Sequence, residues 1–341
     1  MNSKVAVTGG AGFIGSYLCE ALASLGRDVV VLDNLSSGTK DNLREPLNSS
    51  RVKLIVGDCK NPSDVKKVVA NADIVYHFAA NPEVRLELTD PATCFRENTY
   101  ATHILLESIR RTNADTIVFA STSTVYGDAK TIPTPENHTP LVPISIYGAS
   151  KLASEALIAS YCHTYKKSAV ILRLANIVGP RSMHGVINDF ITKLRRNPKQ
   201  LEILGDGHQT KSYLHIDDCI NAIIKAVETA EETVEVFNVG SDDQIEVTRI
   251  AEIVAEEMNL NEVQFSFTGG VNGGRGWVGD VKNMLLDTTK LKSKGWRPRY
   301  NSEQSVRLTI RKILQRRDYS SNLSPHQTLG NLDGPYVRHG W

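Results

Sequence analysis

A glycine-rich turn between two apolar elements at the start of the chain constrains the fold most. The apolar residues 5–7 lead directly into Thr8-Gly-Gly-Ala-Gly-Phe-Ile-Gly15. Apolar residues then recur at spacings of four, four and three, which predicts one face of a helix (Ile14, Leu18, Leu22 and Leu25). A second apolar run, 29–32, follows and ends in Asp33. The sequence therefore predicts a strand, a glycine turn, a helix and a second strand that ends in an acid.

This order of elements is typical of a unit that binds a dinucleotide. We expect Gly9 to allow the tight turn, Gly12 to let the backbone approach a pyrophosphate, and Gly15 to let the helix pack on the strand. The free N–H groups and the dipole at the start of the helix favour phosphate. Asp33 lies 18 residues after Gly15 and can accept hydrogen bonds from both ribose hydroxyls. Because this carboxylate would repel a 2′-phosphate, the sequence predicts NAD rather than NADP.

Strand and helix patterns alternate beyond this unit. Short apolar runs predict strands at 52–57, 73–79, 115–121 and 168–174. Helical patterns separate them, at about 62–70, 97–112 and 147–166. Short strands that are buried on both faces and separated by helices indicate an α/β fold with a doubly wound, parallel Rossmann sheet.

The alternation loosens after about residue 176, where glycine and proline interrupt it. We interpret the later part of the chain as a smaller C-terminal α/β domain over the carboxyl edge of the sheet, where ligands bind in this architecture. The predicted units are an NAD-binding domain (1–176 with 213–240), a substrate domain (177–212 with 241–316) and a polar tail (317–341).

Composition excludes several other classes. With a net charge of +1, the chain has no overall field that would attract nucleic acid or an anionic membrane. No apolar run reaches the length of about 18 residues that a membrane helix needs. The cysteines are scattered without a CxxC pair, which argues against disulfides and a zinc site, and no other metal-ligand spacing occurs. We expect a cytoplasmic protein without a metal.

Tyr147 and Lys151 are the strongest candidates for catalysis. They stand four residues apart at the start of a helical pattern, so they share one helix face. A phenol with a pKa near 10 is a weak base at neutral pH, and a neighbouring ammonium together with the positive nicotinamide would lower that pKa. The pair could then remove a hydroxyl proton. Thr122, at the end of the strand 115–121, could steady the transfer with its hydroxyl.

The chain also contains a second tyrosine–lysine pair at the same spacing. Tyr126 and Lys130 lie in a turn, where the two side chains need not align. The spacing alone is therefore uninformative, and the helix after Tyr147 decides between the two pairs. We interpret Tyr126 as a packing or substrate-lining residue, and we expect His77 and Trp296 to be packed.

A set of motifs occurs in the order found in the extended short-chain dehydrogenase/reductase family. The chain resembles the nucleotide-sugar epimerase branch of this family over roughly residues 3–315, and is most similar to its UDP-galactose (UDP-glucose) 4-epimerases of archaeal and bacterial type. The motifs are Thr8–Gly15, Asp33, Gly57-Asp58, His77–Ala80, Ser121–Gly127, Tyr147/Lys151, Arg173–Pro180 and Gly205–Lys211.

The resemblance implies an NAD-dependent enzyme that inverts C4 of a UDP-sugar, UDP-galactose or UDP-glucose, through a transient 4-keto sugar. It implies a homodimer, formed through the helices predicted at 97–112 and 147–166. The implied catalytic residues are Thr122, Tyr147 and Lys151. Residues implied to bind NAD are Gly9, Gly12, Phe13, Ile14, Gly15, Asp33, Asn34, Ser36, Ser37, Gly38, Asp58, Cys59, Phe78, Ala79, Ala80, Asn98, Tyr147 and Lys151. Residues implied to bind the substrate are Thr122, Tyr147, Asn176, Val186, Lys211 and Arg275.

Departures from the family pattern bear on the substrate. Lys211 replaces the usual arginine and cannot form its bidentate fork. Ser123 and Thr124 stand where related 4,6-dehydratases have an Asp-Glu pair, which argues against water elimination. Met284 occupies a position whose bulk limits N-acetylated substrates, and its flexibility leaves the sugar open. The alternatives are a UDP-N-acetylhexosamine or UDP-uronate 4-epimerase, another nucleotide-sugar oxidoreductase, and an inactive NAD-binding sensor.

Overall fold

The computed structural model describes residues 3–83 and 89–321, and the side chains of all of these except 317–321. Its centre is a seven-stranded sheet in the order β11-β6-β5-β4-β1-β2-β3, in which every neighbouring pair is parallel. The predicted doubly wound Rossmann sheet is confirmed. The strands are β1 (Lys4–Thr8), β2 (Asp28–Asp33), β3 (Val52–Val56), β4 (Ile74–His77), β5 (Thr116–Thr122), β6 (Ser168–Leu174) and β11 (Val234–Val239).

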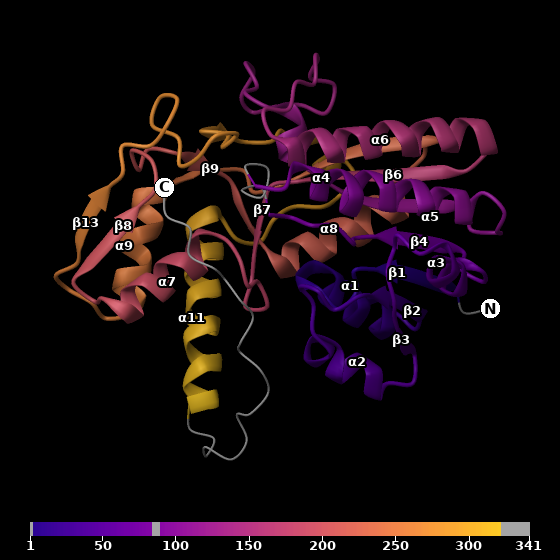
Figure 1. The fold of residues 1–341 in the computed structure, drawn as a ribbon, viewed down its shortest axis with the longest axis horizontal. Helices are drawn as coiled ribbons and strands as arrows, with labels where there is room; N and C mark the ends of the chain where they lie inside the picture. The colour runs from indigo at the N-terminus through magenta and orange to yellow at the C-terminus, as the bar shows by residue number, and fades with distance from the viewer. Residues whose placement is uncertain (1–2, 84–88, 322–341) are drawn as a thin grey trace.

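Helices cover both faces of this sheet (Figure 1). On one face, α1 (Phe13–Ser24) and α8 (Ile216–Thr229) pack against Val5 and Val7. On the other face, α3 (Pro62–Val69), α5 (Ala101–Ile109) and α6 (Ile146–Tyr165) share a core with Ala6. Successive residues of β1 therefore enter opposite cores, which is why its sequence is apolar without alternation.

The order of strands reverses at the centre of the sheet. β1 has β2 and β3 on one side, and β4, β5 and β6 on the other. In sheets of this kind, ligands bind at such a switch point, beyond the carboxyl ends of the strands. The glycine turn between β1 and α1 lies at this edge.

The helix predicted at 97–112 differs from the helix that forms. A short helix α4 (Pro91–Cys94) continues into a π-helical segment η3 (Phe95–Tyr100), and α5 ends at Ile109. Single π-turns inside helices mark positions where the chain is adjusted locally, often beside a functional site. Further short helices are η1 (Lys40–Leu43), α2 (Arg44–Asn48) and η4 (Ser123–Tyr126).

The second lobe has its own apolar core, to the left of the sheet in Figure 1. It contains α7 (Val186–Arg196), α9 (Val247–Glu257) and α11 (Ser302–Ser321), with a parallel pair of β8 (Gln200–Ile203) and β13 (Gln264–Phe267). Short strands connect the lobes: β7 (Asn176–Val178) with β10 (Tyr213–His215), and β9 (Thr210–Lys211) with β12 (Ile245–Glu246) and β14 (Asn283–Met284). α10 (Thr289–Ser293) follows β14. The exact domain boundaries stay a prediction.

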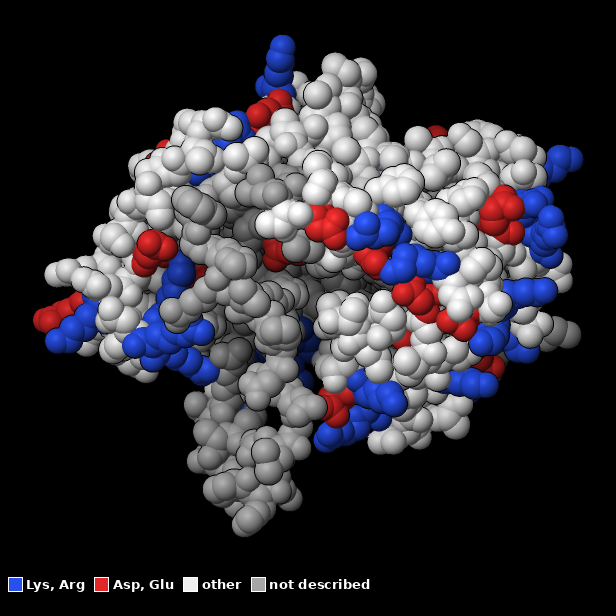
Figure 2. Space-filling view, viewed as in Figure 1, with Lys and Arg blue, Asp and Glu red and all other residues white. Residues whose placement is uncertain are grey.

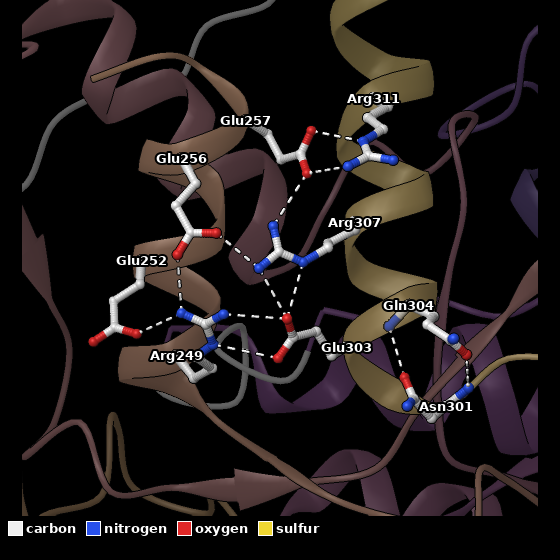
Figure 3. A network of polar contacts seen from close by, with 9 residues as sticks. All are labelled: Arg249, Glu252, Glu256, Glu257, Asn301, Glu303, Gln304, Arg307 and Arg311. Atoms are coloured by element: carbon white, nitrogen blue, oxygen red, sulfur yellow. Dashed lines mark hydrogen bonds and ion pairs between the residues drawn. The ribbon is translucent and has the colours of Figure 1, made fainter. Parts of the chain in front are cut away.

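Ion pairs link α9 to α11 within this lobe (Figure 3). Arg307 Nη2 lies 2.7 Å from Glu256 and Arg249 Nη2 lies 3.1 Å from Glu303. Arg311 and Arg307 both contact Glu257, at 2.7 and 3.2 Å. Isolated exposed pairs stabilise little, but a network with shared carboxylates holds the two helices in register.

The last helix includes the start of the segment predicted as a polar tail. α11 extends to Ser321, so residues 317–321 are helical, and the remainder of the tail, 322–341, lies outside the described residues. Across the described ranges, no helix has both the length and the apolar character that crossing a membrane would require.

A substitution at Gly15 tests the close contact between α1 and the turn. A Cβ there would lie 2.2 Å from the carbonyl oxygen of Gly9, whereas a Cβ at Gly12 would lie 3.2 Å from the same oxygen. Crowding of this kind against backbone costs roughly 1–3 kcal/mol. We expect Gly15→Ala to lower the free energy of unfolding in urea more than Gly12→Ala does. Equal losses in the two variants would show that the turn relaxes freely.

Candidate active site

The glycine turn has the tight geometry that its sequence predicts. Gly9 has a φ of +71°, and its N–H donates to Leu32 O at 2.8 Å. A Cβ on Gly9 would lie 2.6 Å from the backbone nitrogen of Ala79, so the loop 78–80 packs directly on the turn. Gly12 precedes α1 without a side-chain cap, which leaves the first helical N–H groups available for an anion.

Asp33 braces the same turn. Its Oδ2 accepts a hydrogen bond from Ala11 N at 2.9 Å, and its Oδ1 accepts one from Leu35 N at 2.8 Å. The carboxylate is therefore held at the end of β2, and each oxygen keeps a second lone pair. The loop after it also lies against the turn, because a Cβ on Gly38 would stand 2.7 Å from Ala11 O. The predicted residues Asn34, Ser36 and Ser37 belong to this loop.

Two other predicted cofactor positions lie at the end of β3. Asp58 accepts from Lys60 N at 2.8 Å and pairs with Lys60 Nζ at 3.2 Å. Cys59 is buried, and burial raises the pKa of its thiol to about 12. The thiol also makes a hydrogen bond with Thr8. Cys59 is therefore a neutral packing group between β3 and the turn.

Asn98, in the π-helical segment, links two other parts of the chain through its side-chain amide. Its Oδ1 accepts from Asn81 N at 2.8 Å, and its Nδ2 donates to Ser150 Oγ at 3.0 Å and to Asn81 O at 3.3 Å. The side chain is buried and bound on both ends by protein groups. It ties the loop after β4 to α6, and the cofactor contact that the family resemblance implies for Asn98 stays a prediction.

A cleft of about 790 Å³ runs from the carboxyl edge of the sheet into the smaller lobe. This volume lies within the range of roughly 300–1,000 Å³ that small-molecule sites occupy. The cleft brings together residues from both lobes, including the predicted site residues Phe13, Ile14, Thr122, Tyr147, Asn176, Val186 and Lys211. On the face shown in Figure 2, Lys and Arg alternate with Asp and Glu.

Tyr147 and Lys151 converge on the end of β5. Ser145 Oγ accepts from Gly148 N at 3.0 Å and starts α6 just before Tyr147. Lys151 Nζ donates to Ala120 O at 2.8 Å and lies 4.7 Å from the centre of the Phe119 ring. Tyr147 makes a side-chain hydrogen bond with Thr122. The structure therefore groups the three residues that the sequence singled out for catalysis.

Burial acts on both members of the tyrosine–lysine pair. It raises the pKa of Tyr147 to about 12, and the hydrogen bond with Thr122 opposes that rise. It also lowers the pKa of Lys151 to about 7, against the raising effect of Glu155. Both shifts have one cause, because burial disfavours the charged form of each group. The predicted lowering of the Tyr147 pKa by Lys151 together with the nicotinamide charge stays a prediction for the enzyme with NAD⁺ bound.

The second tyrosine–lysine pair is structural. Tyr126 is buried, donates to Asn238 Oδ1 at 2.7 Å and accepts from Arg173 Nη1 at 3.0 Å. Lys130 is exposed. The interpretation of Tyr126 as a packing residue is confirmed, and it does not line the cleft.

The two basic residues predicted to bind substrate differ in position. Lys211 lines the cleft, where its Nζ lies 2.5 Å from Oδ1 of the buried Asp280 and 5.4 Å from the centre of the Trp277 ring. Arg275 does not line the cleft. Its guanidinium forms a fork with Asp128, at 3.0 and 2.9 Å, and the predicted contact of Arg275 with the substrate stays a prediction.

The partners of Lys211 were missed by sequence reasoning. Asp280 lies 69 residues from Lys211 along the chain, and no local pattern links the two. Trp277 stands in the glycine-rich loop 269–279, where its sequence context gave no indication that it borders the cleft. Only the pairing of β9 with β14 brings this loop beside Lys211.

His77 and Trp296 are packed, as predicted. His77 Nδ1 lies 2.7 Å from Thr8 Oγ1, and its Nε2 lies 3.0 Å from Thr102 Oγ1. Burial lowers the pKa of His77 to about 3, so the ring is neutral. Trp296 is buried and donates to Asp218 O at 3.2 Å. Within residues 3–83 and 89–321, no three His, Cys, Asp or Glu side chains gather as a metal site would require.

Comparison with known proteins finds relatives among nucleotide-sugar enzymes. Residues 5–240 match the NAD dependent epimerase/dehydratase family. A putative UDP-glucose 4-epimerase of Methanocaldococcus jannaschii is 32% identical over 90% of this chain and 97% of its own. A solved UDP-galactose 4-epimerase is 44% identical with a TM-score of 0.82, covering 92% of this chain and 99% of its own. A UDP-glucuronic acid 4-epimerase from Bacillus cereus, solved with UDP-glucuronic acid and NAD, is 31% identical with a TM-score of 0.82 at the same coverage of both chains.

Titration of the phenols tests the state of Tyr147. In protein stripped of NAD, we expect Tyr147→Phe to leave the ultraviolet phenolate signal unchanged up to about pH 10, because burial raises the pKa of this phenol to about 12. Difference spectroscopy of the variant against the parent measures this directly. If the variant lacks one phenolate below about pH 9, the protein groups activate Tyr147 without the cofactor.

Proposed function

The chain belongs to the NAD-dependent epimerase/dehydratase family, and from that premise we propose that it inverts C4 of a UDP-sugar, interconverting UDP-galactose and UDP-glucose. The observation that carries the proposal is the grouping of Thr122, Tyr147 and Lys151 at one end of a cleft large enough for a nucleotide sugar. NAD is the cofactor of this family.

The residues at the switch point fit this cofactor. The turn at Gly9 has no room for a Cβ, and the start of α1 offers uncapped N–H groups to a pyrophosphate. Asp33 is held by two backbone amides at the end of β2, where its free lone pairs suit ribose hydroxyls. A fixed carboxylate at this place favours NAD over a 2′-phosphorylated dinucleotide.

The catalytic group divides the work among three side chains. NAD⁺ supplies the hydride acceptor, and its reduced form the donor, so no external redox partner is consumed. Tyr147 takes the proton of the C4 hydroxyl as the alcohol becomes a ketone, and returns it when the ketone is reduced on its opposite face. Thr122 orients the phenol through their hydrogen bond. Lys151 donates a hydrogen bond to Ala120 O, and in its charged form it contributes positive charge near the phenol.

The charge of the cofactor supports the proposed proton transfer. Burial raises the pKa of Tyr147 and lowers that of Lys151 in the chain without a ligand. A positive charge in the cleft favours the phenolate. The nicotinamide of bound NAD⁺ would therefore help Tyr147 to act as a base.

Epimerisation is favoured over dehydration by the residues after Thr122. Ser123 and Thr124 line the cleft at the positions where a dehydratase would need carboxylic acids. Thr124 donates its N–H to Thr122 Oγ1 at 3.2 Å, and the two hydroxyl oxygens are 3.1 Å apart. These hydroxyls orient Thr122, but they cannot serve as the acid and base for loss of water.

Lys211 supports the binding of a diphosphate in the cleft. Asp280 holds the Lys211 ammonium in a fixed position in the cleft wall and neutralises part of its positive charge. Met284 is buried in the wall of the same cleft, where its flexible side chain admits more than one sugar. UDP-N-acetylhexosamines and UDP-uronates are the alternative substrates. The homodimer and the cytoplasmic location stay predictions.

Product analysis tests the reaction. The purified protein is incubated with UDP-galactose without added NAD, and the nucleotide sugars are separated. We expect UDP-glucose to form until an equilibrium mixture is reached. Conversion of only a UDP-N-acetylhexosamine or a UDP-uronate would select the alternative substrates. If none of these sugars reacts even with added NAD, the proposal is rejected.

Matched substitutions in the two tyrosine–lysine pairs test the assignment. We expect Tyr147→Phe to lower kcat by roughly 10²–10⁴-fold, because it removes the proton-transfer group. Lys151→Met should lower kcat at least about tenfold, whereas Lys130→Met, at an exposed site of the same spacing, should leave it unchanged. Steady-state rates and thermal unfolding are measured for each. A comparable loss in Lys130→Met would contradict the assignment.

A further inference from the structure

A buried carboxylate lies directly behind the catalytic pair. Glu155 follows Lys151 by one turn of α6, and only 5% of its surface is exposed. Arg173, on β6, forms a bidentate ion pair with this carboxylate: Nε lies 3.1 Å from Oε1 and Nη2 lies 2.7 Å from Oε2. Ser121, at the end of β5, donates its hydroxyl to the same carboxylate. Glu155 is therefore fixed from two strands.

Glu155 is an anion that the structure places beside two buried cations. Lys151 and Arg173 are both buried, at 3% and 5% exposure. Arg173 pairs with Glu155 directly, and Lys151 precedes Glu155 by four residues on the same helix, so both lie on one helix face. Two other groups near Lys151 supply no negative charge: His77 on β4 is neutral, and burial keeps Tyr147 on its own helix a neutral phenol. A guanidinium cannot lose its proton in a protein, but a buried ammonium can.

We propose that Glu155 is a positioning residue that keeps the side chain of Lys151 charged against the end of β5, with Ser121 and Arg173 holding the carboxylate in place. Glu155 opposes the effect of burial on Lys151 and raises its pKa. The consequence for catalysis rests on the proposed function, whereas the coupling between Glu155 and Lys151 does not.

The direction of the effect follows from which group can give up its charge. If Glu155 loses its charge, Arg173 stays a cation, so Lys151 must release its proton at a lower pH than before. The pKa of Lys151, about 7 with Glu155 present, then falls further. Activity that needs a charged Lys151 is lost as pH rises through that pKa. We expect Glu155→Gln to move the basic limb of the kcat profile about one pH unit lower, with about tenfold less activity above it.

A thermodynamic cycle tests the coupling without substrate. The melting temperatures of the parent, Glu155→Gln, Lys151→Met and the double variant are measured between pH 6 and pH 9, as full-length proteins with matched cofactor content. We expect Glu155→Gln to lose more stability at pH 6, where Lys151 is charged, than at pH 9, where it is neutral. In the Lys151→Met background this pH dependence should vanish.

Glu235 provides the matched control. It is 3% exposed, similar to Glu155, and pairs with Lys290 at 3.3 Å near the opposite end of the sheet. Because the Lys290 side chain is 33% exposed, its charge does not depend on that carboxylate. We expect Glu235→Gln to lower the melting temperature equally at both pH values, and to leave the basic limb of the kcat profile in place.

A paired substitution covers the case in which Glu155→Gln does not fold. Glu155→Gln with Arg173→Met removes both buried charges together and leaves neither unpaired. It should show a pH-dependent loss in the same direction but smaller, because the positive charge of Arg173 is removed as well. A pH-independent loss together with an unshifted basic limb overturns the proposal, since Glu155 would then serve only Arg173. A pH-dependent loss in a protein that converts no nucleotide sugar would retain the coupling and reject the proposed function.

Discussion

The contact between α6 and the end of β5 is the constraint on which the site depends. A buried ammonium, Lys151 Nζ, donates to Ala120 O at 2.8 Å, and the helix can satisfy it only in this register. Moving α6 by one residue would leave a buried charge without its acceptor, which is far more costly than losing apolar contact. The same register sets Tyr147 beside Thr122. One buried polar contact thus aligns the three residues that we propose for catalysis.

The cofactor side of the site depends on a different constraint, the close approach of backbone to backbone. Gly9, Gly15 and Gly38 each leave no space for a side chain, so the turn, the start of α1 and the loop after β2 are packed into one rigid unit. Asp33 reinforces that unit through two backbone amides. A site built in this way is formed before the ligand arrives, which limits the ordering cost of binding. The smaller lobe then completes the cleft with Val186 and Lys211.

Much of the fold followed from residue patterns. The apolar runs of β1, β3 and β6 and the helical repeat of α6 were located to within a residue or two, because local periodicity reports burial directly. The helix around Asn98 was less predictable, since its π-turn arises from contacts with Asn81 and Ser150. The helical pattern after Tyr147 is a local signal of the same kind, and α6 confirms it.

The sequence by itself therefore determined the parallel sheet and the dinucleotide turn, and it singled out the tyrosine–lysine pair that the fold brings to the end of β5. Only the tertiary structure decided which charges meet. Asp280 holds Lys211 from 69 residues away, and Asp128 holds Arg275 outside the cleft from 147 residues away. Burial, which raises the pKa of Tyr147 and lowers that of Lys151, likewise depends on the complete packing around them. Periodicity is a property of neighbours along the chain, whereas desolvation and charge pairing are properties of neighbours in space.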